Sequence, residues 1–445
     1  MVAERPLCFV LMPFGKKPDS AGSTVDFDAV YRELIVPAVE EAGLQPLRAD
    51  EEMTGGIIHK PMFERLILCP YAVADLTTAN ANVFYELGLR HAVRPWSTVL
   101  IFSEGGRLPF DVSHLRAFRY QLTAEGTPEN LETARKALVE RLREAREPTP
   151  DSPVFQLVEG MRPPEIDRLK TDVFRDRVRY STQMKERLAI ARKQGVDTLR
   201  SVERELGTIA DQESGVVIDL FLSYRAVKAW DDMIALVERM SPPLAATVMV
   251  QEQLALALNR AAQGERAEKV LADLLDRRGP SSETYGILGR VYKDRWEAAS
   301  KAGDDFLARG LLEKAIAAYV RGFEADWRDA YPGINAVTLM ELKEPPDSRR
   351  EKLIPVVAYA VERRITVGKP DYWDHATRLE LAVLAKNEEG ALAALADVLA
   401  AVRESWEPET TARNLRLIRE ARQRRQEVVA WTKRVEEELE RRARG

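Results

Sequence analysis

Short apolar runs alternate with helical patterns through the first 146 residues of this 445-residue chain, and the alternation then stops. The strand-like runs are LCFVLM, LQPLRAD, YAVADL, STVLIF and FRYQL, and apolar residues recur at helical spacing over residues 25–43, 57–69, 82–93 and 128–147. Strands that alternate with helices form a parallel sheet covered on both faces. We therefore predict an α/β domain over residues 1–146, with a kink at Pro37.

The rest of the chain reads as helices. Residues 147–153, EPTPDSP, are rich in proline and predict a linker, and no strand pattern occurs over residues 154–445. The pairs Leu254-Ala255 and Leu288-Gly289 are 34 residues apart (288 minus 254), which is the period of tetratricopeptide repeats. A further helix pair is expected over 373–398. We predict an α-solenoid in which small residues let paired helices approach closely.

Three charged stretches of this region carry further expectations. The stretch DRWEAASKAGDDFLARG interrupts the second repeat. The stretch EIDRLKTDVFRDRVRYSTQMKERLAIARKQG predicts a long helix with a mostly solvated surface, and residues 408–445 predict a long solvated or capping helix.

The composition excludes several classes of protein. A formal net charge of -5 argues against a general electrostatic grip on nucleic acid. Cys8 and Cys69 lie in apolar runs and build no disulfide framework, which suits a reducing cytosol, and the four histidines follow no zinc-binding spacing. No apolar stretch has the length of a membrane span or a signal peptide. We expect a cytoplasmic protein with no metal and no cofactor that binds neither nucleic acid nor membranes.

The strings LGRVYKDRWEAA, KAIAAYVRGFEADW and YPGINAVTLM give the helical region a family resemblance. It resembles the central regulatory region of the apoptosis signal-regulating kinases, the MAP3K TRAF-binding domain. The resemblance implies a tetratricopeptide-like array that binds a protein partner. The chain has no Gly-rich loop, HRD or DFG motif, so no kinase domain is expected in it.

The first domain resembles the nucleoside 2-deoxyribosyltransferase-like proteins, a Rossmann-like group allied to TIR-type domains. The matching strings are VLMPFG, VADLT and NVFYELGLRHA. The resemblance implies that Glu86, in the ELG string, is the nucleophile that accepts the glycosyl group. The transferases usually carry an acid a few positions earlier, where this chain has TTANAN with Asn80 and Asn82. The nearest acid is Asp75, at the end of a predicted strand.

The chemistry of Glu86 has two readings. Cleavage of an N-glycosidic bond passes through a ribosyl cation-like state, which a carboxylate stabilises or traps covalently. A helix that starts at Asn80 or Asn82, both good N-caps, would place Glu86 within about two turns of its positive end. The alternative is an exposed ion pair between Glu86 and Arg90, four residues later. Asp75 is likewise either a sugar-binding or proton-transfer group or part of an Asx turn with Thr77 or Thr78.

The remaining candidates for ligand binding lie after the predicted strands. Backbone at Met12 and Gly15 would approach a ligand, and Phe14 would stack on a base or simply pack. Asp50 follows the second strand, where an acid often binds ribose hydroxyls, although a solvated charge explains it equally well. Gly55-Gly56 would cradle a phosphate through free N–H groups or act as a hinge.

Two functions follow from these patterns. In the first, a signalling or defence-type protein binds a nucleoside, a nucleotide or NAD and cleaves its glycosidic bond under the control of a protein-interaction solenoid that also permits homo-oligomers. In the second, an inert or ligand-sensing α/β module is carried on a non-catalytic scaffold. The missing acid in TTANAN favours the scaffold, whereas Asp75 and the ELG string favour the enzyme.

Overall fold

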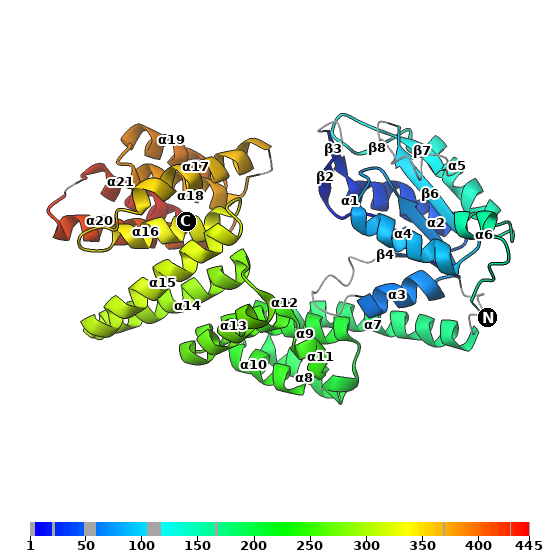
Figure 1. The fold of residues 1–445 in the computed structure, drawn as a ribbon, viewed down its shortest axis with the longest axis horizontal. Coiled ribbons are helices and arrows are strands. Elements are labelled where there is room, and N and C mark those ends of the chain that lie inside the picture. Colours follow the sequence, from blue (N-terminus) through cyan, green and yellow to red (C-terminus); the bar gives the residue numbers. More distant parts are fainter. Residues whose placement is uncertain are drawn as a thin grey trace. The chain divides into compact units, whose positions relative to one another are not determined.

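The computed structural model describes residues 5–19, 23–48, 59–104, 117–164, 168–367, 370–427 and 429–444. The chain divides into two compact units, Met1–Ser223 and Tyr224–Gly445 (Figure 1). The first unit contains the predicted α/β domain and several helices that follow it. The second unit is built from helices throughout its described residues.

A six-stranded sheet with the order β4-β1-β5-β6-β7-β8 forms the centre of the first unit. Every pairing from β4 to β7 is parallel, and β8 joins β7 antiparallel. The strands are β1 (Leu7–Leu11), β4 (Gln45–Arg48), β5 (Tyr71–Asp75), β6 (Thr98–Ser103), β7 (Ala117–Leu122) and β8 (Pro128–Glu129). The five parallel strands are the five that the apolar runs predict, so the α/β class is confirmed.

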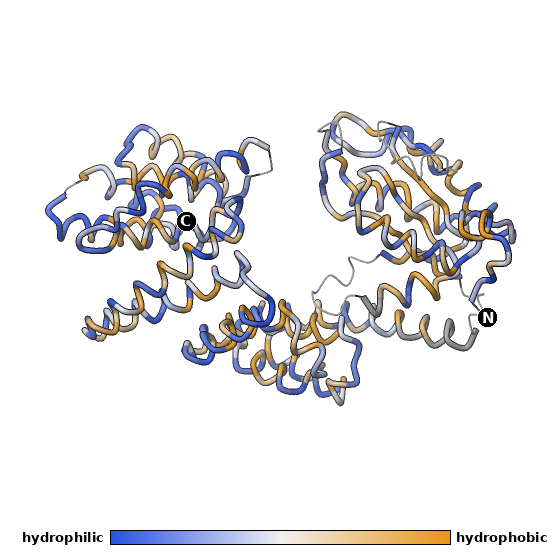
Figure 2. The backbone as a smooth tube through the Cα atoms, viewed as in Figure 1, coloured by the Kyte–Doolittle hydropathy of each residue, from blue (hydrophilic) through white to orange (hydrophobic). Residues whose placement is uncertain are grey.

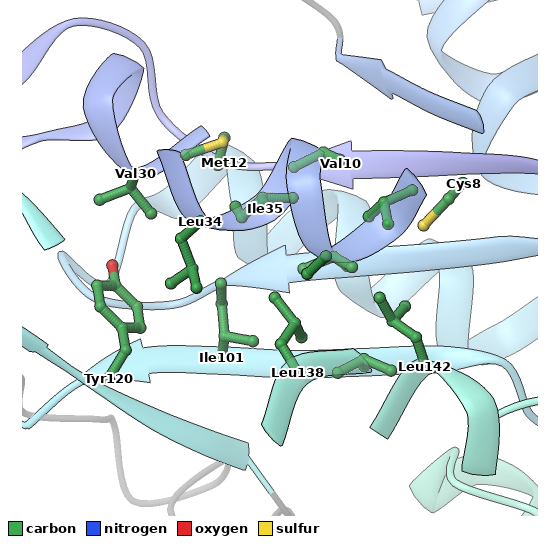
Figure 3. Packing of buried hydrophobic residues seen from close by; sticks show 14 of the residues in the cluster. Cys8, Val10, Met12, Val30, Leu34, Ile35, Ile101, Tyr120, Leu138 and Leu142 are labelled. Carbon is green, nitrogen blue, oxygen red and sulfur yellow. The ribbon is translucent and has the colours of Figure 1, made fainter. Parts of the chain in front are cut away.

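Strand β1 shows why these runs are apolar without alternation. Its even-numbered residues Cys8 and Val10 pack on one face of the sheet, whereas Leu7 and Phe9 pack on the other. Both faces are covered by helices, so every side chain of the strand is buried. Figure 2 shows that hydrophobic residues predominate along the central strands of this domain. Figure 3 shows the first face, where the strands pack against the helices of residues 27–41 and 131–144.

The helices of this domain follow the predicted order with local differences. They are α1 (Phe27–Ala29), the π-helical turn η1 (Val30–Ile35), α2 (Val36–Glu41), α3 (His59–Leu68), α4 (Ala81–Val93) and α5 (Leu131–Glu144). Pro37 lies in the first turn of α2, directly after η1, so the irregularity expected at Pro37 takes the form of a π-helical turn. Two elements were not predicted. One is the hairpin of β2 (Lys16–Pro18) and β3 (Thr24–Asp26). The other is β8, which occupies the first residues of the helix predicted over 128–147. That helix starts later, at Leu131, because Asn130 has a left-handed backbone (φ 51°).

The residues after Glu147 are tied to the sheet. Asp151 accepts a 2.8 Å hydrogen bond from the N–H of Thr98, and the buried hydroxyl of Ser152 donates to the carbonyl of His91 at 2.7 Å. Further along, Phe174 belongs to the core cluster on the second face of the sheet. The boundary expected at 147–153 therefore differs from the division between the compact units, which falls after Ser223.

The helices that complete the first unit are α6 (Pro153–Leu157), α7 (Arg168–Gln194), α8 (Val196–Leu206), the short turn η4 (Ile209–Asp211) and most of α9 (Ser214–Ala226). Helix α7 was expected to present a mostly solvated surface. It also buries Phe174, Val178, Met184, Leu188 and Ala191, so one stripe of the helix packs inside the unit.

The second unit opens with α10 (Trp230–Arg239) and α11 (Pro242–Ala245) and continues as helical hairpins. The hairpins are α12 (Val248–Arg260) with α13 (Gly264–Arg278), α14 (Ser282–Lys301) with α15 (Asp305–Ala325), α16 (Ala330–Glu341) with α17 (Arg350–Val367), α18 (Tyr372–Leu384) with α19 (Glu388–Ala400), and α20 (Trp406–Arg424) with α21 (Trp431–Arg444). The predicted solenoid is confirmed, and α18 with α19 is the pair expected over 373–398.

The 34-residue offset and the small residue at its end have a direct structural meaning. Leu254 and Leu288 occupy the first helices of successive hairpins, α12 and α14. A Cβ atom at Gly289 would lie 2.7 Å from the ring of Tyr319 on α15, so this glycine permits the close approach of the two helices. The stretch expected to interrupt this repeat instead lengthens α14 and α15. The charged C-terminal stretch forms a hairpin rather than one long helix.

Candidate functional site

The carboxyl edge of the sheet contains the switch point of a doubly wound fold. Strand β1 lies between β4 and β5. The connection that follows β1 leads to β4 on one side, whereas the connection that follows β5 leads to β6 on the other side. Ligands of such sheets bind at this switch point. Leu11 at the end of β1 is paired with Ala74 near the end of β5. The loop with Met12, Phe14 and Gly15 and the loop that follows Asp75 therefore begin side by side.

Asp75 is buried within a hydrogen-bonded network. Its Oδ1 accepts from the N–H of Thr77 at 3.0 Å and from the Thr77 hydroxyl at 2.5 Å, and its Oδ2 accepts from the hydroxyl of Tyr120 at 2.7 Å. Burial raises the pKa of this carboxyl, while the three hydrogen bonds act in the opposite direction. This arrangement is the Asx turn that was one of the two readings of Asp75. The contact of Tyr120 with Asp75 was not predicted, because the sequence of β7 alone does not show which strands lie beside it.

Asn80 is the N-cap of α4, as the sequence predicts. Its side-chain oxygen accepts from the N–H groups of Asn82 and Val83 at 3.0 and 3.3 Å. Asn82 itself lies in the first turn of the helix and is exposed. The amide of Asn80 is thus used within the helix, whereas the side chain of Asn82 faces solvent.

Glu86 is half-buried on α4, about 8 Å along the helix axis from Ala81. Its carboxylate makes no hydrogen bond or ion pair with any residue that the structure describes. Burial raises the pKa of Glu86 from 4.5 to about 7. The ion pair with Arg90 is therefore not formed, and that expectation is wrong.

Arg90 is engaged elsewhere because helix α3 ends beside it. Its guanidinium is fully buried and donates to the carbonyl oxygens of Leu66, Cys69 and Pro70 at 2.8, 2.6 and 3.0 Å. The last carbonyls of a helix have no partner within that helix, so a cation there satisfies them. Arg94 donates in the same way to the carbonyl of Ile67. Arg90 and Arg94, which follow the ELG string, therefore have structural roles.

A second group of side chains surrounds the loop after β1 and comes from β4 and from the helical residues 27–35. The guanidinium carbon of Arg48, at the end of β4, lies 5.4 Å from the ring centroid of Phe14 and 4.2 Å from that of Tyr31. Asp28 lies 3.0 Å from Nη1 of Arg48 and also accepts from the N–H of Gly15 at 3.3 Å. Met12, by contrast, is a core residue.

Phe14 packs against the Arg48 cation, and Gly15 has a left-handed backbone (φ 64°) with open space around it. Arg48 was not among the candidate site residues, although only 8% of it is exposed. Its position at the end of a strand was the available signal. Asp50, Gly55 and Gly56 lie outside the described residues.

The described residues offer neither a metal centre nor a membrane-spanning helix. They contain no group of three or more His, Cys, Asp or Glu side chains placed to hold a metal ion. Within the same ranges, no helix combines the length and apolar character that a membrane span needs.

Two relatives and one solved structure show what this chain is similar to. Mitogen-activated protein kinase kinase kinase 6 of Homo sapiens is 26% identical over 400 residues, which cover 84% of this chain and 28% of that protein. Mitogen-activated protein kinase kinase kinase nsy-1 of Caenorhabditis elegans is 28% identical over 222 residues, covering 45% of this chain and 14% of that protein. The chain thus spans less than a third of these relatives. A thermophilic tetratricopeptide repeat protein of Thermus thermophilus aligns at 16% identity, with a TM-score of 0.35 that is too low to establish a shared topology; it covers 46% of this chain and 99% of that one.

The family match extends over most of the chain. The model of the MAP3K TRAFs-binding domain matches residues 83–437, from the first turns of α4 into α21. The match includes the second half of the sheet domain as well as the solenoid. The chain therefore belongs to the MAP3K TRAFs-binding domain family.

Proposed function

We propose that this protein is a cytoplasmic regulator of a signalling pathway whose helical region recruits a protein partner. The family match over residues 83–437 supports this role, since the family is named for the binding of TRAF proteins. A solenoid of helical hairpins also offers the extended surface that such proteins use for binding.

We further propose that the sheet domain binds a nucleoside, a nucleotide or NAD and cleaves its N-glycosidic bond with the help of Glu86. The observation that carries this proposal is the half-buried, unpaired carboxylate of Glu86 with its pKa near 7. Glu86 lies on α4, the helix that follows β5 of the switch point, and carboxylates with perturbed pKa values are common in functional sites. The ELG resemblance names the same residue.

In this reaction the bond between C1′ of the sugar and the base nitrogen breaks, and the base leaves with the bonding electrons. The ionised carboxylate of Glu86 either stabilises the ribosyl cation until water adds to C1′, or forms an ester at C1′ that water then hydrolyses. In both cases the water loses a proton, which goes to the departed base when that base leaves as an anion and to solvent when it leaves neutral. With its pKa raised to about 7, Glu86 is able to gain or lose a proton near neutral pH. A cationic ligand beside it would lower its pKa, so the charged nicotinamide ring of NAD fits this site better than a neutral base.

The test compares three purified full-length proteins: wild type, Glu86→Gln, and Glu140→Gln as a control on the exposed surface of α5. Each is incubated with NAD, AMP, adenosine and 2′-deoxyadenosine, and the release of free base is measured by chromatography. We expect wild type and Glu140→Gln to release base and Glu86→Gln to release none. Equal release from wild type and Glu86→Gln would remove Glu86 from the mechanism.

The scaffold is the second candidate, and the network around Asp75 favours it. Thr77 and Tyr120 take up both oxygens of this carboxylate, so it is not free to protonate a leaving base. A scaffold predicts no base release from any substrate, with or without a protein partner. A ligand-sensing scaffold differs from an inert one in that NAD or AMP would raise its melting temperature without being consumed.

A further inference from the structure

Four basic side chains gather where the first helices of three hairpins meet in the second unit. Arg260 ends α12, Arg290 and Lys293 lie on α14, and Arg413 lies on α20. The charges of Arg290 and Arg413 each lower the pKa of both Arg260 and Lys293, after the larger effect of burial. We call these four residues the basic cluster.

The first helices face one another around this cluster. Lys293 Nζ on α14 donates to Asn414 Oδ1 on α20 at 3.1 Å, although α20 belongs to the third hairpin after that of α14. Arg413 forms an ion pair with Glu297 across the same two helices. A flat row of hairpins would not allow these contacts, so this row curves and the cluster lies on its inner side.

The carboxylates that face the cluster are already engaged. Asp294 accepts a 2.7 Å hydrogen bond from the amide of Asn259, and Glu297 is paired with Arg413. Glu380 accepts from the hydroxyl of Thr338 and lies near enough to Lys293 to act on its charge.

The remaining cations are less completely matched. Arg260 is exposed and makes no hydrogen bond or ion pair with a described residue. Arg290 is better compensated: it forms an ion pair with Asp294 at 3.9 Å and a hydrogen bond with Tyr331, and only its Nε lacks a hydrogen-bond acceptor in the described ranges. The direct partner of Lys293 is a neutral amide. Arg260 and Lys293 are therefore the least compensated cations of the cluster, and an incoming anion would stabilise their charged forms.

We propose that the basic cluster is the docking site for an acidic peptide segment of the protein partner. Guanidinium groups bind carboxylates through two parallel hydrogen bonds, and the inner side of a helical solenoid is where such proteins bind extended chains. Cations contributed by α12, α14 and α20 match successive carboxylates along a peptide better than one small anion. The inference rests on the proposed recruiting role of the helical region and is independent of the chemistry proposed for the sheet domain.

The test uses a fluorescein-labelled hexa-glutamate peptide and the full-length protein, with binding followed by fluorescence anisotropy at low salt. We expect wild type to bind this peptide, and the affinity to fall as salt is added. The double variant Arg290→Gln/Lys293→Gln should raise Kd at least about tenfold. Lys301→Gln, an exposed lysine at the end of α14, removes a charge outside the cluster and should leave Kd unchanged.

Several outcomes would overturn the proposal. One is no binding of hexa-glutamate by wild type, and another is an equal loss in Lys301→Gln and in the double variant. Displacement of the peptide by free glutamate at the same concentration would show a small-anion site rather than a peptide site. Arg260→Gln, on the exposed rim, should also weaken binding and guards against a folding defect in the double variant. If wild type and the double variant capture the same proteins from a lysate, recruitment holds and the cluster is not its site.

Discussion

Replacing Glu86 by glutamine should stabilise the first unit, and the gain should depend on pH. Glutamine keeps the shape of the side chain and cannot ionise. In the wild-type protein burial raises the pKa of Glu86 from 4.5 to about 7, so the folded protein holds a proton that the unfolded chain releases between these values. A raised carboxyl pKa means that stability is highest below pH 4.5 and falls as pH rises toward 7.

The size of the effect follows from the shift. A difference of about 2.5 pKa units, at 1.36 kcal/mol per unit, corresponds to roughly 3 kcal/mol as an upper limit. Glu86 is half-buried rather than fully enclosed, so solvent screening reduces this figure to about 2 kcal/mol. We therefore expect Glu86→Gln to match wild type near pH 4.5 and to exceed it by about 2 kcal/mol at pH 8.

The assay is urea denaturation of wild type, Glu86→Gln and Glu140→Gln at several pH values from 4.5 to 8.5. The difference between each variant and wild type cancels the other groups that titrate in this range. Glu140 is exposed on α5, so its variant should stay within about 0.5 kcal/mol of wild type at every pH. A flat difference for Glu86→Gln across this range, or a loss of stability at pH 8, would refute the view that Glu86 is an unpaired, desolvated carboxylate.

Three further substitutions test the packing. Gly289→Ala should lower the melting temperature, with a loss of about 1–3 kcal/mol, because the new Cβ would lie 2.7 Å from the ring of Tyr319; Gly310→Ala, which meets no atom within 4 Å, should not. Arg90→Met should lower the urea midpoint through a loss of about 3 kcal/mol, since it leaves the buried carbonyls at the end of α3 without a donor. Glu341→Gln should lower thermal stability by about 3–5 kcal/mol, because three arginines converge on this buried carboxylate.

The regular parts of the fold could be predicted because their signals are local. The central parallel strands β1, β5 and β6 are runs of mostly apolar residues, and they are buried on both faces of the sheet. Asn80 was recognised as a helix cap because capping involves only the next three residues. Gly289 was recognised because the repeat period places it beside a partner helix.

The partners of charged side chains could not be predicted, because they depend on distant segments. The ring contact of Arg48 with Tyr31 requires β4 to lie beside β1, which the predicted strand LQPLRAD does not reveal by itself. Arg90 reads as an ion-pair partner of Glu86, but the carbonyls at the end of α3 are nearer to it. Proline content likewise does not reveal that Asp151 accepts a hydrogen bond from Thr98 of β6 or that Ser152 donates one to His91 of α4.

The string NVFYELGLRHA contains residues that pack in the fold and one residue, Glu86, for which we propose a role in catalysis. Val83, Leu87, Arg90 and His91 are buried in the fold, so packing alone would preserve most of a resemblance to any protein with this sheet and helix. Glu86 lacks such a reason, because it contacts no partner among the described residues and its desolvation lowers stability above pH 4.5. In the proposed function, a ligand of the sheet domain accounts for a side chain that weakens the fold and satisfies no described neighbour. Glu86→Gln therefore separates the two candidate functions: an enzyme should become more stable and inactive, whereas an inert scaffold should become more stable with nothing lost.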